Sequence, residues 1–142
     1  MTSLRPMTAN FVIGSLVCIA LLDGMIRFGL FPIPATICNL GIGLGIRLPE
    51  TVLWGVIVLM LIVALWRSMI RPFGSENVAW GAVFTGGLIN AFDRLLHDCV
   101  TDYLHLPFFP SFNLADIMIF LGIVTLTSFL LGILPKAHLY VS

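Results

Sequence analysis

Residues 51–70, TVLWGVIVLMLIVALWRSMI, form a continuous apolar run in which Arg67 is the single charged residue. A helix needs about 20 residues to cross the hydrocarbon core of a bilayer, and this run has that length. Three further apolar runs of similar length lie at about 9–29, 78–96 and 114–134. The pattern predicts an all-α membrane protein with four transmembrane helices in one domain, residues 1–142.

The composition is typical of the same class. Apolar residues make up 59% of the 142 residues and charged residues only 10%, which is far from the average of soluble proteins. The net charge is zero and no basic cluster is present, so we expect no nucleic-acid partner. The three cysteines (Cys18, Cys38, Cys99) are odd in number and lack CxxC spacing. We interpret them as small apolar fillers, not as a disulfide framework or a zinc site.

Charged residues indicate the orientation of the helices. Asp23 and Arg27 interrupt the end of the first run and no Ala-x-Ala-type cleavage site follows, so we expect a retained helix and not a secretory signal. Arg5, in the N-terminal tail, Arg67 and Arg71, around the second loop, and Lys136, in the C-terminal tail, are basic. The positive-inside rule therefore places both tails and the second loop in the cytoplasm. Both termini are then cytoplasmic. The first and third loops face outward, and every acidic residue except Glu76 lies on that side.

The first outer loop, at about 30–50, is the least helical segment of the chain. Pro32, Pro34 and Pro49 break helices, and residues 39–45 alternate glycine with apolar residues. Such alternation is typical of short strands that are half-buried at an interface, so we predict a small extracytoplasmic β-rich element there. A nucleotide-binding glycine loop is an alternative, but no Rossmann strand–helix context surrounds these glycines.

The third apolar run carries a polar stripe. Gly86, Asn90 and Arg94 follow one another at spacings of four residues and therefore share one helix face. We expect this face to meet protein or water, with glycine allowing close approach of a neighbouring helix and the other two presenting donors. The alternative is that Arg94 only marks the outer interface and extends toward water.

Two aspartates lie near the outer ends of the third and fourth runs. Asp116 follows Asn113 by three residues, which fits an N-cap and a first-turn carboxylate and has a purely structural explanation. A loop that contains Pro107 and Pro110 connects Asp102 to Asp116, so the two aspartates can lie at the same depth in the membrane. If they meet, they share one proton, and the pair can activate water and protonate a leaving group. Asn90, Asn113 and Arg94 are expected to supply orienting hydrogen bonds.

These motifs resemble those of a known family. The series Gly86-x-x-x-Asn90-x-x-x-Arg94, Val100-x-Asp102 and Phe112-Asn113-x-Ala115-Asp116 resembles the lipoprotein signal peptidases (signal peptidase II), which are four-helix bacterial membrane aspartyl proteases. By this resemblance, Asp102 and Asp116 are the catalytic residues.

Two earlier segments resemble the same family. Asp23 with Arg27 resembles its Asp-Gln-x-x-Lys element, and Asn39-x-Gly41 resembles an Asn-x-Gly element that belongs to a small β-cradle on the membrane surface. The supporting and substrate-binding residues implied by the resemblance are Asn39, Gly41, Gly86, Asn90, Arg94, Asn113, Ala115, Asp23 and Arg27. Gly24 and Arg27 depart from the family pattern, and loop 103–111 is shorter than usual.

The resemblance implies an endopeptidase of the bacterial cytoplasmic membrane with its active site near the outer face. It would remove signal peptides from prolipoproteins, cutting before the diacylglyceryl-modified cysteine, with no metal or cofactor. Membrane lipids and the lipidated substrate are the expected partners, and the chain is expected to act as a monomer.

Three alternatives have weaker support. A divalent metal could bind among His97, Asp98, Asp102, His105 and Asp116, but no HExxH-like spacing is present. A Cys99–His97 nucleophilic pair is disfavoured, because i,i+2 side chains point apart on a helix. The third alternative is a non-enzymatic scaffold or small transporter, whose acidic residues only mark interfaces.

Overall fold

The computed structural model describes residues 9–27, 29, 35–41, 46–70 and 74–135, which form four helices and two short strands. In chain order the elements are α1 (Ala9–Arg27), β1 (Ile37–Asn39), α2 (Glu50–Ile70), α3 (Ser75–His97), β2 (Val100–Asp102) and α4 (Leu114–Leu130). Each helix overlaps one of the four apolar runs, with its ends within a few residues of the predicted ones.

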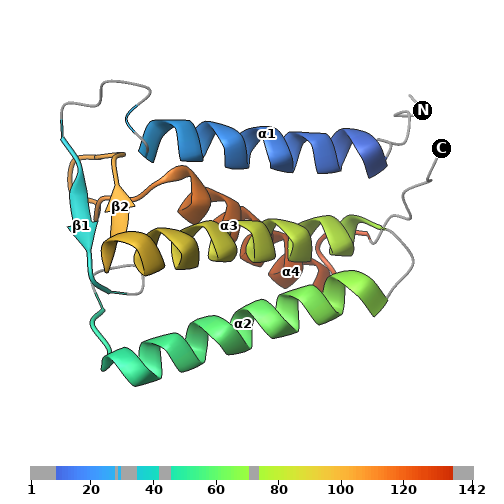
Figure 1. Ribbon diagram of the computed structural model, residues 1–142. Coiled ribbons are helices and arrows are strands. Elements are labelled where there is room, and N and C mark those ends of the chain that lie inside the picture. Colours follow the sequence, from blue (N-terminus) through green and yellow to red (C-terminus); the bar gives the residue numbers. More distant parts are fainter. Residues whose placement is uncertain (1–8, 28, 30–34, 42–45, 71–73, 136–142) are drawn as a thin grey trace.

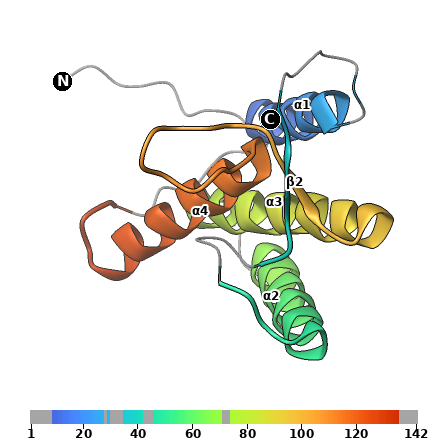
Figure 2. The same ribbon diagram turned by 90° about the vertical axis from the view of Figure 1, so that its left-hand side faces the viewer.

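The helices run side by side and the two strands cover one end of the bundle (Figure 1). Viewed from that end, α3 lies in the middle, with α1 and α2 on opposite sides of it (Figure 2). α3 packs most extensively against α4, then against α2, and less against α1. The central helix is therefore the element from which polar side chains can reach the other segments.

Helix ends at the sheet side are fixed by local hydrogen bonds. Asn113 is the N-cap of α4: its side chain accepts from the backbone N–H of Asp116, and the Asp116 carboxylate accepts from the Asn113 N–H. This reciprocal arrangement satisfies two of the otherwise unpaired donors of the first turn. α3 ends at Asp98, whose left-handed backbone (φ 59) lets its N–H donate to the Arg94 carbonyl. The predicted cap at Asn113 is confirmed.

The sheet has two antiparallel strands from distant parts of the chain. Ile37 pairs with Asp102, and Asn39 pairs with Val100. The first outer loop therefore supplies one strand, as predicted, but this strand largely precedes the glycine-alternating residues 39–45 on which the prediction rested. Leu40 and Gly41 are not in a strand, and residues 42–45, Pro32 and Pro34 lie outside the described residues. The partner strand follows α3 and does not come from the loop itself.

Glycines allow α3 and α4 to approach closely. A Cβ atom on Gly86 would lie 2.5 Å from the Ala115 carbonyl oxygen, and one on Gly122 would lie 2.7 Å from the Ala79 carbonyl oxygen. Such distances are well inside normal contact, so only glycine permits this packing. The predicted role of Gly86 is thus confirmed, and the contact lies next to Asp116.

The outward faces of the helices are apolar. Leu59, Trp66 and Phe120 are each about 60% exposed (63%, 59% and 65%). Exposed apolar surface on this scale is typical of a membrane-embedded protein. Among the described helices, α2 alone is long and apolar enough to cross a membrane by length and composition, while α4 is a shorter apolar helix.

We predict that Gly86→Ala lowers stability, because the added methyl group collides with the backbone of α4. The expected loss is about 1–3 kcal/mol, the usual cost of overpacking. Thermal unfolding in detergent measures it. Gly55→Ala in α2 is the matched control, since nothing lies within 4 Å of its Cβ position, and it should keep or slightly raise stability. Equal behaviour of the two variants would contradict the close packing.

Candidate active site

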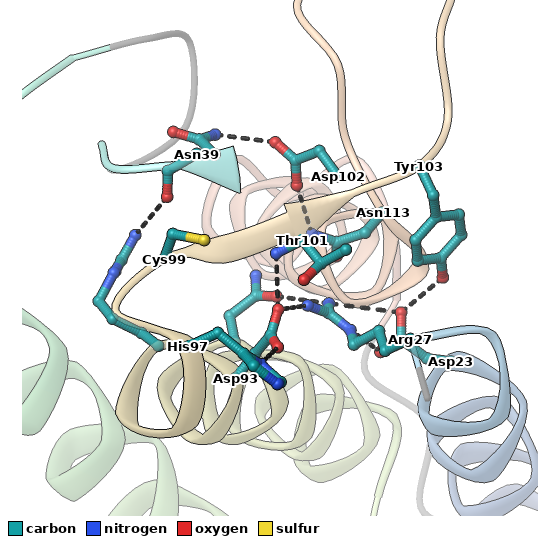
Figure 3. A network of polar contacts seen from close by, with 12 residues as sticks. Asp23, Arg27, Asn39, Asp93, His97, Cys99, Thr101, Asp102, Tyr103 and Asn113 are labelled. Carbon is teal, nitrogen blue, oxygen red and sulfur yellow. Dashed lines mark hydrogen bonds and ion pairs between the residues drawn. The ribbon is translucent and has the colours of Figure 1, made fainter. Parts of the chain in front are cut away.

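Asp102 ends β2 and is almost completely buried, with 1% of its surface exposed. One carboxylate oxygen accepts from Nδ2 of Asn39 at 2.9 Å, and the other accepts from Nδ2 of Asn113 at 2.7 Å. Figure 3 shows the carboxylate between these two amides. The strand pairing therefore brings Asn39, from the first outer loop, into contact with the carboxylate of Asp102, which follows α3.

Asp116 lies in the first turn of α4, on the other side of the same asparagine. Its Oδ1 accepts from Nδ2 of Asn90 at 2.7 Å, and its Oδ2 accepts from the Asn113 backbone N–H at 3.2 Å. Asn113 thus contacts both carboxylates, through its side-chain amide on Asp102 and through its cap bonds on Asp116. The structure brings the two predicted aspartates to one place.

Burial and hydrogen bonds act on Asp102 in opposite directions. Desolvation raises the pKa of its carboxyl group above the ordinary value, because burial penalises the charged form. The two asparagine donors and the positive charge of Arg27 favour the ionised form and oppose this rise. The charges of Asp102 and Asp116 also repel one another. This environment favours one shared proton over two ionised carboxylates.

Arg94 holds the backbone of the outer loop. Its Nη2 donates to the Gly41 carbonyl at 2.7 Å and to the Asn39 carbonyl at 3.4 Å, and only 7% of the residue is exposed. It does not extend toward water, so the interface-marker alternative is wrong. No hydrogen bond between Arg94 and either Asp102 or Asp116 is found in the described part of the chain. Gly41 also donates its N–H to the Asn39 side chain at 2.9 Å.

Arg27 joins α1 to α3. Its Nε donates to Asp23 at 2.5 Å, which confirms the predicted pair across one helical turn. Its other nitrogens donate to Asp93 and, at 2.8 Å, to Oδ1 of Asn90. Because the Asn90 oxygen is thus occupied by a donor, its NH2 group faces Asp116. Arg27 therefore fixes the orientation of an amide that binds one of the two aspartates.

Two residues of this network were missed by the sequence reading. Asp93 accepts from Arg27, from the Thr101 N–H at 2.6 Å, and contacts His97 at 2.7 Å. Tyr103 donates to Asp23 at 2.6 Å, and burial raises the pKa of its hydroxyl. The i,i+4 spacing of Asp93 and His97 was a readable signal, whereas nothing local in the sequence indicates the contact of Tyr103 with α1.

The interpretation of the cysteines as apolar fillers was wrong for two of them. Cys38 and Cys99 form a disulfide, with Cα atoms 5.5 Å apart, that ties β1 to the segment before β2. Cys18 is free and exposed. The bonded residues are 61 positions apart, so no spacing rule could pair them. The disulfide also removes the thiol of the Cys99–His97 alternative.

The proposed metal ligands do not gather. His97 contacts Asp93, while His105 contacts Ser111 and the Ala35 carbonyl. Within the described ranges, no three His, Cys, Asp or Glu side chains lie together in a way that could hold a metal ion. The arrangement of these residues therefore does not favour the metal-site alternative.

A groove of about 710 Å³ runs from Asp116 along the bundle. Its outer end is lined by Asn90, Arg94 and Asp116, and its length by apolar residues of α2, α3, α4 and the loop before α4, among them Met60, Ile119 and Phe120. An apolar channel that ends at polar groups and a carboxylate suits an amphiphilic ligand.

The comparison with protein families decides the relationship. The family model described as signal peptidase (SPase) II matches residues 12–131. The chain belongs to the signal peptidase II family.

Relatives and a solved structure agree with that placement. The chain is 35% identical over 71 residues to a lipoprotein signal peptidase of Helicobacter pylori (46% of this chain, 45% of that protein). It is 34% identical over 88 residues to one of Syntrophomonas wolfei (59% and 58%). The chain thus spans about half the length of the curated relatives it matches. A bacterial membrane enzyme solved in meso at 2.3 Å resolution has the same fold (TM-score 0.74, 21% identity, 89% of this chain and 91% of that one).

We predict that Arg27→Ala is strongly destabilising, because it leaves Asp23 and Asp93 buried without their cation. The expected loss is about 3–5 kcal/mol, with reduced but not abolished activity. Arg27→Lys should be intermediate, since an ammonium group cannot reproduce the planar fork.

Thermal unfolding in detergent tests this, with Arg67→Ala as the control. Arg67 pairs with Glu76 at 3.1 Å in a more exposed site, so its loss should cost about 1 kcal/mol or less. If both variants unfold at the same temperature, Arg27 is not the cation that stabilises buried Asp23 and Asp93.

Proposed function

We propose that the protein is an aspartic endopeptidase that removes signal peptides from bacterial prolipoproteins and cuts before the diacylglyceryl-modified cysteine. The observation that carries the proposal is the junction of Asp102 and Asp116 through Asn113, with Asp116 at the polar end of an apolar groove. Family membership supports the same activity. The scaffold or transporter alternative does not account for two carboxylates oriented by three asparagines.

In the proposed reaction the two carboxyl groups have complementary roles. The ionised member takes a proton from a water molecule, which attacks the scissile carbonyl carbon. The protonated member donates its proton to the carbonyl oxygen. The carboxyl group that took the proton from water then passes it to the leaving amine as the C–N bond breaks, while the other carboxylate recovers its proton from the collapsing tetrahedral intermediate. Asn39 and Asn113 hold Asp102, and Asn90 holds Asp116, so neither carboxylate has to reorient during the step. Arg94, which lines the groove, holds the loop that carries Asn39.

The groove explains how a lipidated substrate would be placed. Its apolar length can bury acyl chains or the apolar segment of a signal peptide, while its polar end presents Asp116 to the scissile bond. Since the substrate is itself anchored in the bilayer, binding would need no aqueous intermediate.

The proposed topology follows from the same polarity. All four helices would cross the cytoplasmic membrane, with both termini in the cytoplasm and the sheet at the outer face. Support comes from the apolar outer surfaces of the helices and from the gathering of Asp23, Asp93 and Asp102 beside the strands (Figure 3). Asp116 belongs to the same group through its contacts with Asn90 and Asn113. The protein is proposed to act as a monomer.

We predict that Asp102→Asn and Asp116→Asn each reduce turnover by several orders of magnitude. Each amide keeps the size of the carboxylate but cannot exchange a proton at working pH, and the two groups act as one unit. Cleavage of a lipidated model prolipoprotein measures the rate. Binding of that substrate should persist, because apolar burial supplies it.

Asp98→Asn is the matched control. Asp98 is exposed at the end of α3, in a left-handed conformation that asparagine adopts readily. This variant should keep most of the activity. A folded Asp102 or Asp116 variant that cleaves at nearly the wild-type rate would exclude the aspartic mechanism and favour a scaffold or transporter.

We also predict that cleavage survives treatment with a divalent-metal chelator, because two carboxyl groups and water suffice for the reaction. The same assay is run with and without chelator. Loss of activity that added zinc restores would instead support a metallopeptidase.

A further inference from the structure

β1 has few means of holding its place. It contains three residues and pairs with one strand of equal length, and an isolated two-stranded ladder of this size is only marginally stable. Arg94 adds hydrogen bonds to the carbonyls of Asn39 and Gly41. Among the described residues, the Cys38–Cys99 disulfide is the single covalent link across the sheet.

The disulfide lies beside a donor to the catalytic pair. Cys38 directly precedes Asn39, whose amide binds Asp102, and Cys38 stands opposite Thr101 in the strand pairing. On the other strand, Cys99 precedes Val100, which pairs with Asn39. The covalent bond therefore closes the ladder at the residues next to the Asn39–Asp102 hydrogen bond. Figure 3 shows Cys99, Asn39 and Asp102 around this corner of the sheet.

We propose that the Cys38–Cys99 disulfide is a positioning element of the peptidase, which keeps the amide of Asn39 on the carboxylate of Asp102. The inference rests on the proposed function, since it assigns a role within that site. Asn39 reaches Asp102 from β1, so its position depends on the strand pairing. Asn113 is fixed independently of β1, by its role as the cap of α4. Loosening β1 thus removes one of the two donors and leaves the other in place.

The loss of that donor has a defined electrostatic consequence. The Asn39 hydrogen bond favours the ionised form of Asp102, so its removal raises the pKa of that carboxyl group. The charged groups that act on Asp102 from the other elements are Arg27 of α1, Asp93 and Arg94 of α3, and Asp116 of α4. None of these belongs to β1, and only Arg94 holds it, through the Asn39 and Gly41 carbonyls. All four groups keep their charges when β1 loosens, so the loss of the Asn39 donor is the change that acts directly on Asp102. The limb of the kcat profile that Asp102 controls should therefore move to higher pH.

The test compares the Cys38→Ser/Cys99→Ser double variant with Cys18→Ser, which removes the free thiol of α1 and serves as the control. We expect kcat for a lipidated model prolipoprotein to fall by about 10- to 100-fold in the double variant, the effect of a misplaced catalytic contact. KM should change by less than about 2-fold, because the groove is intact. The control should keep wild-type values.

A double-mutant cycle separates positioning from general stabilisation. Asn39→Ala alone should lower kcat and move the limb that Asp102 controls as the double serine variant does. Adding Asn39→Ala to that variant should produce little further loss, because both changes remove the same contact. Additive losses in kcat would show that the disulfide acts elsewhere and would overturn the proposal.

Reduction of the intact protein provides a second route if the serine variant folds poorly. A dithiol reductant supplies two electrons and two protons, converts the disulfide to two thiols, and is itself oxidised to a cyclic disulfide. We expect kcat to fall on reduction and to recover on reoxidation. An unchanged kcat in protein whose thiols are shown by alkylation to be reduced would overturn the proposal.

Two readouts do not depend on peptidase activity. Mass spectrometry of non-reduced peptides should show the Cys38–Cys99 cross-link, and finding both residues as free thiols in the native protein would overturn the inference. Infrared difference spectroscopy detects the protonated carboxyl group of buried Asp102, assigned by its absence in Asp102→Asn, and the midpoint of this signal should move to higher pH on reduction. An unmoved midpoint would also overturn it. If the oxidised wild-type protein cleaves no prolipoprotein, the proposed function fails separately, and these two readouts still decide the inference.

Discussion

A single guanidinium group makes the rest of this arrangement possible. Arg27 meets the carboxylates of Asp23 and Asp93 and the side-chain oxygen of Asn90, and the side chains of all three charged residues are buried. Removing two negative charges from water is costly unless a cation with matching geometry faces them. The planar fork of arginine can meet three acceptors at once, which the compact ammonium of lysine cannot do in the same way. Arg27, which stands where the family motif has lysine, therefore makes contacts that depend on its being an arginine.

Asparagine side chains position the two proposed catalytic carboxylates, and one of them is held by Arg27. Asn90 is oriented by Arg27 and presents its NH2 group to Asp116. Asn113 caps α4 with its oxygen and binds Asp102 with its nitrogen, so one side chain has both a structural and a chemical role. The helix cap formed by Asn113 and Asp116 and the proposed catalytic role of Asp116 are therefore compatible and not alternatives. The residue that begins the helix also joins the two carboxylates.

The sequence allowed those features to be predicted that depend on local periodicity. Apolar runs located the helices, and spacing located the Gly86 face, the Asp23–Arg27 pair and the Asn113 cap. The partner of β1, the disulfide, the contacts of Asp93 with Arg27 and Thr101, and the contact of Tyr103 with Asp23 could not be found in this way. They join residues between 8 and 80 positions apart, and only the packing of α1 and β1 against α3 and β2 brings most of them together.

The position of the groove has a consequence for how any ligand arrives. Its walls come from α2, α3 and α4, whose outward faces are apolar, so in the proposed topology a ligand would enter sideways from the lipid phase. Encounter would then be a search in two dimensions, with a rate that depends on how many ligand molecules occupy each unit of membrane area. The thickness and crowding of the bilayer, more than any concentration in solution, would set how often the site is filled.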